Sequence, residues 1–426
     1  MTPSLLAHGF GDAGDLPITL QMLVLLSGGA VLGVAAALSA RAARGEQPTR
    51  RGGVRLPAAL TGLVDHAASR AALRLAGGAL LGVAAVTAAV GPDDFIANPA
   101  PALFFSVFGV VVLLGGSLLV GPLWRLANPL PALSGAIARL SGDAEERLVR
   151  SVPARLGVRP AAALLALYVW TDLVVGRRPL GVLVVLAAHV VAQLAGAAVY
   201  GRAWYGHGDG FEVYSRVVGW LAPLDRDADG RLVLRGPRPR MARLDPPAGL
   251  LAVVAVLLGA HVFDSLTDTL AWQQLLFGRP RLAVQTAGLA ACIGAVGAVA
   301  AGATHARFLR PALVPLVAAY AIAHHLGPLL AEVQQAAIAL SDPFGRDADL
   351  LGLAGRRVTE EVMPASLAAV AQIGAFLGLH VLAVAVAHDR AIARYDPRGA
   401  RAVQFPVRAL IVASTVGGVA VRFAPQ

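Results

Sequence analysis

The sequence contains a single cysteine, Cys292, and no lysine, because all 36 of its basic residues are arginine. One cysteine excludes an intrachain disulfide and cannot supply the ligand pairs of a zinc finger. Charged residues make up only 15% of the chain and aromatic residues only 6%. Hydrophobic residues instead account for 57% of the 426 positions, and the mean hydropathy is +0.66. This balance is typical of a polytopic α-helical membrane protein rather than a soluble enzyme.

The net charge of +10 raises the question of a nucleic-acid partner. The arginines are distributed between apolar stretches and are not gathered into a binding patch. We therefore predict the lipid bilayer, and no nucleic acid, as a partner. A composition of arginine without lysine, rich in Ala, Val, Leu and Gly, suggests a high-GC bacterial genome. We therefore expect the bacterial cell (plasma) membrane as the location, with a homo-oligomer left open.

Apolar stretches long enough to cross a bilayer occur about ten times, so we expect one all-α membrane domain over residues 1–426. The stretches cover residues 17–41, 72–91, 101–124, 160–176, 179–200, 248–271, 282–305, 311–340, 365–388 and 405–424. The fourth and the last are the weakest of these predictions.

The orientation follows from the arginines. With the N-terminus outside, 28 of the 36 arginines fall on the inner side, as the positive-inside rule requires. The first residues lack the basic region of a signal peptide and carry Asp12 and Asp15 instead, so we expect them to be retained and to lie outside. The main exception is the pair Arg177 and Arg178, in a tight outer turn.

The loop over residues 201–247 is predicted to form a cytoplasmic subregion. Its first half places Trp204, Phe211 and Trp220 among polar residues, which predicts an interfacial helix along the inner surface. Its second half predicts a short hairpin that turns at Asp229-Gly230.

Histidines recur near the middle of four predicted spans. His189, His261, His324 and His380 each lie about 10 to 16 residues from one end of a span, so all four approach the midplane. One buried histidine is most often a structural residue bonded to a neighbouring carbonyl. Four from separate helices favour a functional polar pocket, since neutral imidazole is the commonest ligand of transition metals.

Carboxylates accompany these histidines. Asp264 lies three residues after His261 and so on the same helix face, and Glu332 lies seven residues after His325. A carboxylate at either position should be paired or protonated, because an isolated charge in the bilayer is costly. Asp342, in the Ser-Asp-Pro-Phe-Gly motif after the eighth span, either caps the next segment or supplies a ligand from above.

Several pieces of the chain together resemble a family of bacterial, largely actinobacterial, polytopic membrane proteins named fenitrothion hydrolase. The matching pieces are His8-Gly-Phe-Gly with Asp15-Leu-Pro-Ile, Gly201 to Leu224 with Asp229-Gly-Arg-Leu-Val-Leu, His261-Val-Phe-Asp264, Tyr320-Ala-Ile-Ala-His324, Ser341-Asp-Pro-Phe-Gly345, and His380 through His388-Asp-Arg. The resemblance covers most of the chain and implies hydrolysis of an organophosphorus triester. Where the family has an aromatic residue after the first histidine, this sequence has His325.

Under this interpretation the protein is a hydrolase of small hydrophobic phosphotriester-like substrates. A divalent transition metal such as zinc or copper, held by His261, His324, His380 and either Asp264 or Asp342, would activate a water molecule. Glu332 is the predicted general base, and Asp264 is the second predicted catalytic carboxylate. No nucleotide loop, nucleophile elbow or HExxH motif is present to narrow the reaction.

Two other classes of protein stay open on the same residues. A proton-coupled transporter or channel would use the pocket as a proton relay or a substrate site at the midplane, and Pro315 and Pro328 permit a break in the eighth span. A haem or copper electron carrier would use the layer of histidines as ligands.

Overall fold

The computed structural model describes residues 19–44, 53–140, 150–359 and 362–423, and this part of the chain is predominantly helical with very few residues in strands. The predicted all-α polytopic class is therefore confirmed. Nine helical segments of the described chain are long and apolar enough to cross a membrane. They are formed by α1 (Leu20–Ala43), α3 (Ala67–Val90), the run of α4 (Pro99–Pro101), η3 (Ala102–Gly116) and α5 (Ser117–Val120), α9 (Pro179–Tyr200), α13 (Leu250–Thr267), α15 (Arg281–Ala303), α16 (Val314–Ser341), α17 (Ala365–Ile392) and α18 (Pro397–Phe423).

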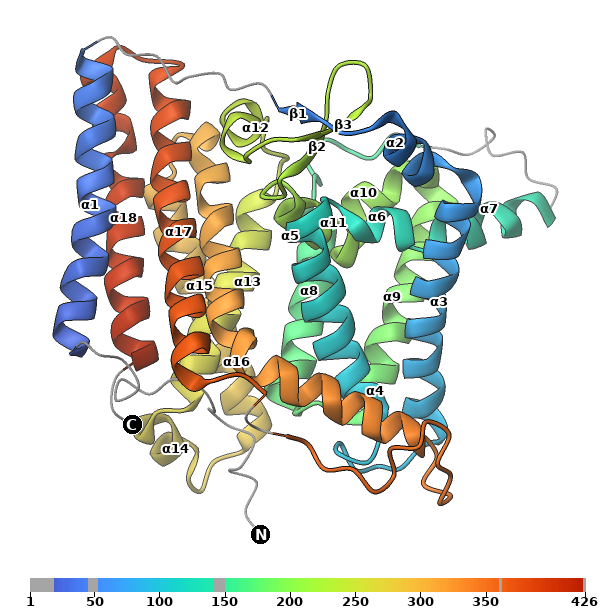
Figure 1. Ribbon diagram of the computed structural model, residues 1–426. Coiled ribbons are helices and arrows are strands. Elements are labelled where there is room, and N and C mark those ends of the chain that lie inside the picture. Colours follow the sequence, from blue (N-terminus) through green and yellow to red (C-terminus); the bar gives the residue numbers. More distant parts are fainter. Residues whose placement is uncertain (1–18, 45–52, 141–149, 360–361, 424–426) are drawn as a thin grey trace.

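The remaining predicted span, residues 160–176, contains a shorter helix. It is formed by α8 (Arg159–Trp170) and a π-helical continuation, η4 (Thr171–Val175). Figure 1 shows α8 running through the bundle in the same direction as its neighbours. It packs against α13 and α11. Each of the ten predicted stretches therefore contains a helix of the bundle.

The long helices pack side by side, and α17 contacts α1, α16 and α18. Figure 1 shows α1, α17 and α18 at one side of the bundle, α3 and α9 at the other, and α13, α15 and α16 between them. The most extensive contacts join α13 to α15, α16 to α17, and α1 to α18. The start of α1 and the end of α18 lie at the same end of the bundle, as an even number of crossings requires.

The long arginine-rich loops gather at the other end, which we call the sheet end. It carries α2 (Ala58–Asp65), α7 (Leu130–Leu140), α12 (Arg238–Arg243) and a small antiparallel sheet (Figure 1). The predicted hairpin is present as β2 (Leu224–Arg226) and β3 (Leu232–Leu234), with Arg226 opposite Leu232. A third strand, β1 (Val54–Arg55), pairs with the free edge of β3 and was not predicted. It ties the loop after α1 to the 201–247 loop.

The helix predicted to lie along the membrane surface is instead buried inside the protein. It forms as α11 (Gly210–Gly219). Asp209 is the N-cap of this helix, and its carboxylate accepts the backbone N–H groups of Phe211 and Glu212. Eight of its residues are buried, because α5, α6 (Leu123–Ala127), α8 and η3 enclose it. Ser215 fixes this position by hydrogen bonds to the Ser117 hydroxyl and the Trp124 backbone N–H. The aromatic pattern that indicated a lipid interface serves protein packing.

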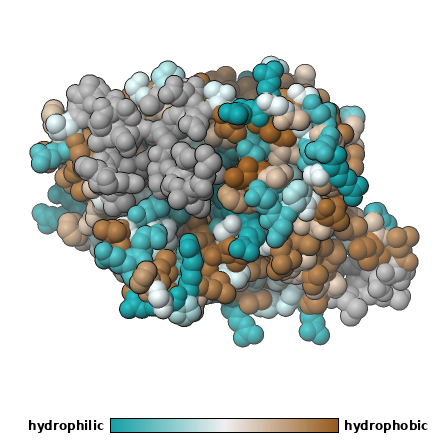
Figure 2. Space-filling view, turned by 90° about the horizontal axis from the view of Figure 1, so that it is seen from below, coloured by the Kyte–Doolittle hydropathy of each residue, from teal (hydrophilic) through white to brown (hydrophobic). Residues whose placement is uncertain are grey.

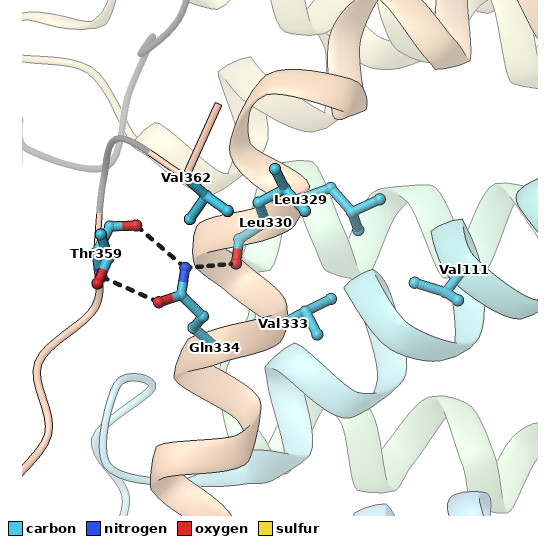
Figure 3. Close-up of a pocket in the computed structure, with 7 residues that line it drawn as sticks. All are labelled: Val111, Leu329, Leu330, Val333, Gln334, Thr359 and Val362. Atoms are coloured by element: carbon cyan, nitrogen blue, oxygen red, sulfur yellow. Dashed lines mark hydrogen bonds between the residues drawn. The ribbon is translucent and has the colours of Figure 1, made fainter. Parts of the chain in front are cut away.

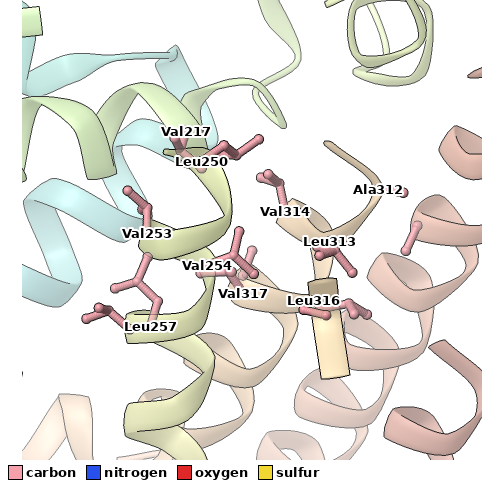
Figure 4. Packing of buried hydrophobic residues seen from close by; sticks show 14 of the residues in the cluster. Val217, Leu250, Val253, Val254, Leu257, Ala312, Leu313, Val314, Leu316 and Val317 are labelled. Atoms are coloured by element: carbon pink, nitrogen blue, oxygen red, sulfur yellow. The ribbon is translucent and has the colours of Figure 1, made fainter. Parts of the chain in front are cut away.

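The largest apolar core lies between α13 and the start of α16. Figure 4 shows side chains of α13 meeting those of η6 (Arg307–Leu313) and α16, among them Val254, Leu313 and Val317. Ionisable residues appear further along both helices. Leu257 is followed one turn later by His261, and Val317 is followed two turns later by His324. The ionisable residues therefore lie beside this core, which continues past His261 to Phe263.

Beyond this core α16 bends. Figure 1 shows its second half leaving the direction of the bundle and crossing the end opposite the sheet. Pro328 explains the bend, because it lacks an N–H group and its ring clashes with the carbonyl four residues earlier, that of His324. Gln335 then donates to the backbone oxygen of Ile96 at 2.8 Å, and Ala336 packs into the core formed by η3, α3 and α9. Hydrophilic and hydrophobic residues lie side by side on this end (Figure 2).

Candidate functional site

Three histidines and one aspartate meet where α13 faces α16. The ring centroids lie 5.7 Å apart for His261 and His324, 5.9 Å for His261 and His325, and 4.7 Å for His324 and His325. Asp264, one turn after His261, places its Oδ2 2.8 Å from the Nε2 of His324. We call these four residues the imidazole cluster. His261 and Asp264 share one face of α13, as predicted, and His324 of α16 contacts that face.

A second group of charged side chains lies beside this cluster and is centred on Arg177. Its Nε donates to Asp172 at 2.5 Å, and its Nη1 donates to Glu332 at 2.7 Å. The other oxygen of Glu332 accepts the hydroxyl of Ser106 at 2.7 Å. The guanidinium also lies over the ring of Phe105. Bonds to both carboxylates and the aromatic contact fix the guanidinium in one orientation, and we call this group the arginine network.

The imidazole cluster and the arginine network form one electrostatic unit. Arg177 and Asp172 lie close enough to interact with His324, and Arg177 also interacts with Asp264. The two groups share α16, since Glu332 follows His325 by two turns. Their side chains are only partly exposed, at 39% for His324 and 24% for Glu332. Partly buried charges interact more strongly than fully hydrated ones.

Residues of the arginine network lie on irregular helical segments. Ser106 lies on η3 and Asp172 on η4, both π-helical, and Arg177 adopts a left-handed conformation with φ of 56° directly after Gly176. A π-helix shifts the face that a side chain occupies and recurs at functional sites. A left-handed arginine is uncommon and costs conformational energy, which its two ion pairs offset.

His380 lies in different surroundings from the imidazole cluster. Its Nδ1 is 2.8 Å from the carbonyl oxygen of Phe376, and its ring packs against Phe376 and Tyr320 at centroid distances of 4.1 and 6.0 Å. The ring is fully buried, and its Nε2 makes no hydrogen bond. His380 therefore has the surroundings of a structural histidine, although Tyr320 lies only one turn before His324 on α16.

Asp342 caps the turn that follows α16. Its two carboxylate oxygens accept the backbone N–H groups of Arg346 at 2.8 Å and Asp347 at 2.9 Å. These hydrogen bonds, that of Arg346 first, lower the pKa of Asp342 below its usual value. Of the two interpretations left open for this residue, the structure shows the cap.

The predicted metal ligands are thus divided between separate places. His261 and His324 lie in the imidazole cluster with Asp264, whereas His380 and Asp342 are engaged elsewhere. Among the residues that the structure describes, no group of three or more His, Cys, Asp or Glu side chains is arranged to hold a metal ion. The predicted set of ligands therefore does not fit a metal ion in this arrangement.

His189, the remaining midplane histidine, belongs to a polar group nearer the sheet end. Its Nε2 lies 3.6 Å from the Oδ1 of Asp209, and its ring packs on Phe211. Asp209 also accepts the side-chain amide of Asn128 at 2.8 Å. Because Asp209 is fully buried and caps α11, this group stabilises the helix start.

Four residues of the site were not predicted to belong to it: Ser106, Asp172, Arg177 and His325. Ser106 gives no signal in the sequence, because serine is common in apolar helices. Arg177 did give one, since it violated the positive-inside pattern in a Gly-Arg-Arg-Pro turn next to Asp172. An arginine on the unexpected side, five residues after an intramembrane carboxylate, indicates an inward-facing pair.

The fold and this site together define an all-α polytopic membrane protein with a partly buried cluster of ionisable residues between η3, η4, α13 and α16. A scan against protein-family models gave no match, and neither the curated proteins nor the solved structures gave one.

Proposed function

We propose that this protein is a membrane-embedded hydrolase of the bacterial plasma membrane that cleaves hydrophobic ester substrates of the phosphotriester type. The observation that carries the proposal is the 2.8 Å contact between His324 Nε2 and Asp264 Oδ2, beside the guanidinium of Arg177. A histidine oriented by a carboxylate is a general base, and a fixed cation stabilises the oxygen on which negative charge develops. The resemblance to fenitrothion hydrolases supports the same bond type.

Each residue then has a definite role. Asp264 accepts the Nε2–H of His324, so the Nδ1 of that ring is the basic nitrogen, and it removes a proton from the attacking water. The new P–O bond forms as the P–O bond to the leaving alcohol breaks, and the imidazolium returns the proton to that alcohol. Asp264 stabilises the imidazolium while it exists.

Arg177 would lie against the phosphoryl oxygen. Its Nε and Nη1 are occupied by Asp172 and Glu332, which leaves the Nη2 donors for the substrate. Glu332 was predicted to be the general base. In the structure it is paired with Arg177 and accepts from Ser106, so the proposed role of Glu332 is to position Arg177.

The decisive test is turnover by purified protein in detergent. Hydrolysis of an uncharged aryl phosphotriester should fall by about a hundredfold or more in His324→Gln and in Asp264→Asn, because each removes the oriented base. His380→Gln should keep the rate of the unaltered protein, whereas a metal ligand at that position would make it inactive. Full activity of His324→Gln, or no turnover by the unaltered protein, overturns the proposal.

Metal content is measured on the same preparation. The prediction of bound zinc or copper requires about one metal ion per chain and loss of activity with a chelator. A general base formed by His324 and Asp264 requires neither a bound metal ion nor a loss of activity with a chelator. The visible absorption spectrum of that sample tests the haem or copper carrier.

A proton-coupled transporter is the second candidate, and irregular helices favour it. The π-helical segments η3 and η4 and the bend of α16 at Pro328 all flank the charged site, and interrupted helices around a buried site are a feature of transporters. Proteoliposomes distinguish the two functions. A transporter gives flux that depends on a pH gradient without consuming the substrate, and a hydrolase gives product without a gradient.

A further inference from the structure

We infer that α7 is an interfacial helix, which lies in the leaflet at the sheet end with one face among the acyl chains and takes the phospholipid of that leaflet as its partner. This inference does not use the charged site and is independent of the proposed hydrolysis. The surface helix predicted in the first half of the 201–247 loop is buried as α11. Helix α7 has the features that such a surface helix requires.

One face of α7 carries apolar side chains that the protein leaves exposed. Leu133, Ile137 and Leu140 are 45%, 45% and 89% exposed. They are spaced by four and three residues, so they share one face of the helix, which we call the apolar stripe. Arg139 is also exposed, but it lies about 200° around the helix from Ile137. A helix with an apolar face and a charged face suits the boundary between acyl chains and headgroups.

The helix runs across the direction of the spans. Figure 1 shows α7 at the sheet end, extending sideways from the bundle beyond α3. Its first residue is held in place, because the Tyr205 hydroxyl donates to the carbonyl oxygen of Leu130 at 3.0 Å and the Asn128 side chain accepts the Leu130 N–H at 3.0 Å. Tyr205 and Asn128 are buried, and Asn128 donates in turn to the buried Asp209. Buried contacts therefore fix the point from which α7 leaves the bundle.

The level of α7 along α3 matches the edge of the hydrocarbon. Pro129, the residue before α7, lies against Gly78 of α3. Arg74 lies one turn nearer the sheet end, and it is the last charged residue of α3, which continues to Val90. Four residues of helix rise about 6 Å, so α7 begins about that far inside the last charge of α3. Interfacial helices bury their apolar faces at a similar depth, roughly 5 to 10 Å.

An aromatic pair marks the same boundary on α9, the main packing partner of α7. Tyr200, the last residue of α9, stacks on Trp204 with the ring centroids 5.4 Å apart, and both residues are half-buried. Tyrosine and tryptophan concentrate where a bilayer meets water. Trp204 directly precedes Tyr205, which holds the start of α7. The charges of α3 and the aromatic pair of α9 therefore agree on the position of α7.

Phospholipid fits the apolar stripe better than a second protein does. Three aliphatic side chains supply far less than the roughly 800 Å² that each partner buries in a stable protein interface. Exposed apolar residues elsewhere have another cause. Figure 3 shows Val111 of η3 and Leu330 of α16, which are similarly exposed but lie on helices that cross the bilayer and so face lipid along their length. The stripe of α7 has no such cause, because α7 does not cross.

The test measures the depth of α7 by spin labelling of the full-length protein in vesicles of phosphatidylethanolamine with phosphatidylglycerol. Cys292→Ala removes the native thiol, and Ile137→Cys or Arg139→Cys then accepts a nitroxide label. Collisions with oxygen, which concentrates in lipid, and with a nickel complex, which stays in water, give the depth. The label at residue 137 should lie about 5 to 10 Å inside the phosphates, and the label at residue 139 should lie at or outside them.

Two other exposed apolar positions calibrate this measurement. Val184→Cys on α9 should report lipid, whereas Leu234→Cys on β3 should report water, although Leu234 is as exposed as Ile137. A label at residue 137 that is as accessible to nickel as the label at residue 234 overturns the inference, because α7 then lies outside the membrane. Shielding of residue 137 from both oxygen and nickel also overturns it, because a protein then covers the stripe.

A charged substitution tests whether the apolar stripe holds α7 in the lipid. With the label at Leu140→Cys, Ile137→Asp should shift the ratio of inserted to water-exposed label about tenfold towards water, because the burial of one isoleucine side chain is lost. Arg139→Asp is the matched control and should leave the label at its depth, since residue 139 lies off the stripe. Equal effects of the two substitutions contradict the inference. If Ile137→Asp does not fold, the depths at residues 137 and 139 decide the question.

Discussion

Replacing Arg177 by methionine should destabilise the protein, because it removes both ion pairs of this residue. The arginine holds Asp172 and Glu332, whose side chains are only 14% and 24% exposed. Without it, two carboxylates remain partly buried with no cation. Removing one partner of a buried pair costs about 3 to 5 kcal/mol, and the residual hydration here places the loss near 3 kcal/mol. That is about a hundredfold in the ratio of folded to unfolded protein.

The assay is heat treatment in detergent followed by size-exclusion chromatography, which measures the temperature at which half of the protein survives. Arg177→Met should lower this temperature by several degrees. Arg178→Met is the matched control, because Arg178 is exposed and adjacent, and a surface change of this kind is usually worth less than about 0.5 kcal/mol.

A compensating variant tests whether the unpaired carboxylates cause the loss of stability. Adding Asp172→Asn and Glu332→Gln to Arg177→Met removes the unpaired charges and should restore much of the lost stability. Lysine at position 177 should rescue only in part, because an ammonium group cannot reproduce the two-sided contacts of the guanidinium. An Arg177→Met protein as stable as Arg178→Met, or no recovery after both carboxylates are neutralised, would refute the role given to the arginine.

Two further predictions concern the sheet end. Gly157 has φ of +50°, and a Cβ at this position would lie against the carbonyl oxygen of Ala248, so Gly157→Ala should cost about 2 kcal/mol or more. Gly230 has φ of +78° but lies in open space, so Gly230→Ala should cost only about 1 kcal/mol. Equal losses of thermal stability in the two variants would contradict this reasoning. Hydrogen bonds from Arg226 lower the pKa of Asp65 below its usual 3.8, so its stabilising contribution is complete above that pH and is lost as the pH falls through the lower folded value. The difference in stability between the unaltered protein and Asp65→Asn should therefore vanish in strong acid, and a constant difference across pH would contradict it.

The charged site was only half predictable, for a physical reason. Asp264 and His261 are three residues apart on one helix, so their shared face follows from helical geometry alone. The approach of His324 depends on how α13 packs against α16, which many apolar residues decide together. Helix α16 also bends at Pro328, and the direction of a bend depends on the neighbours that receive it.

Depth alone grouped residues that the fold keeps apart. His380 and His324 were expected together because both lie near the middle of a span. In the structure the His380 ring packs on Phe376 and Tyr320, on a face of α17 determined by rotation about the helix axis. Similar depth leaves that rotation undetermined. The burial of α11 shows the same limit, since aromatic residues that suit a lipid interface also suit a protein interior.

The sequence by itself determined the all-α membrane class of this protein and the presence of a helix in each of the ten predicted apolar stretches, because hydropathy depends on residues that are neighbours along the chain. It also determined the hairpin at the sheet end, because the turn at Asp229-Gly230 is local. Only the tertiary structure decided that Arg177 turns inward to two carboxylates, that the two halves of α16 face different partners, and that three imidazoles share one site. Those contacts join residues as far apart as Asp172 and Glu332, and their formation depends on the packing of whole helices.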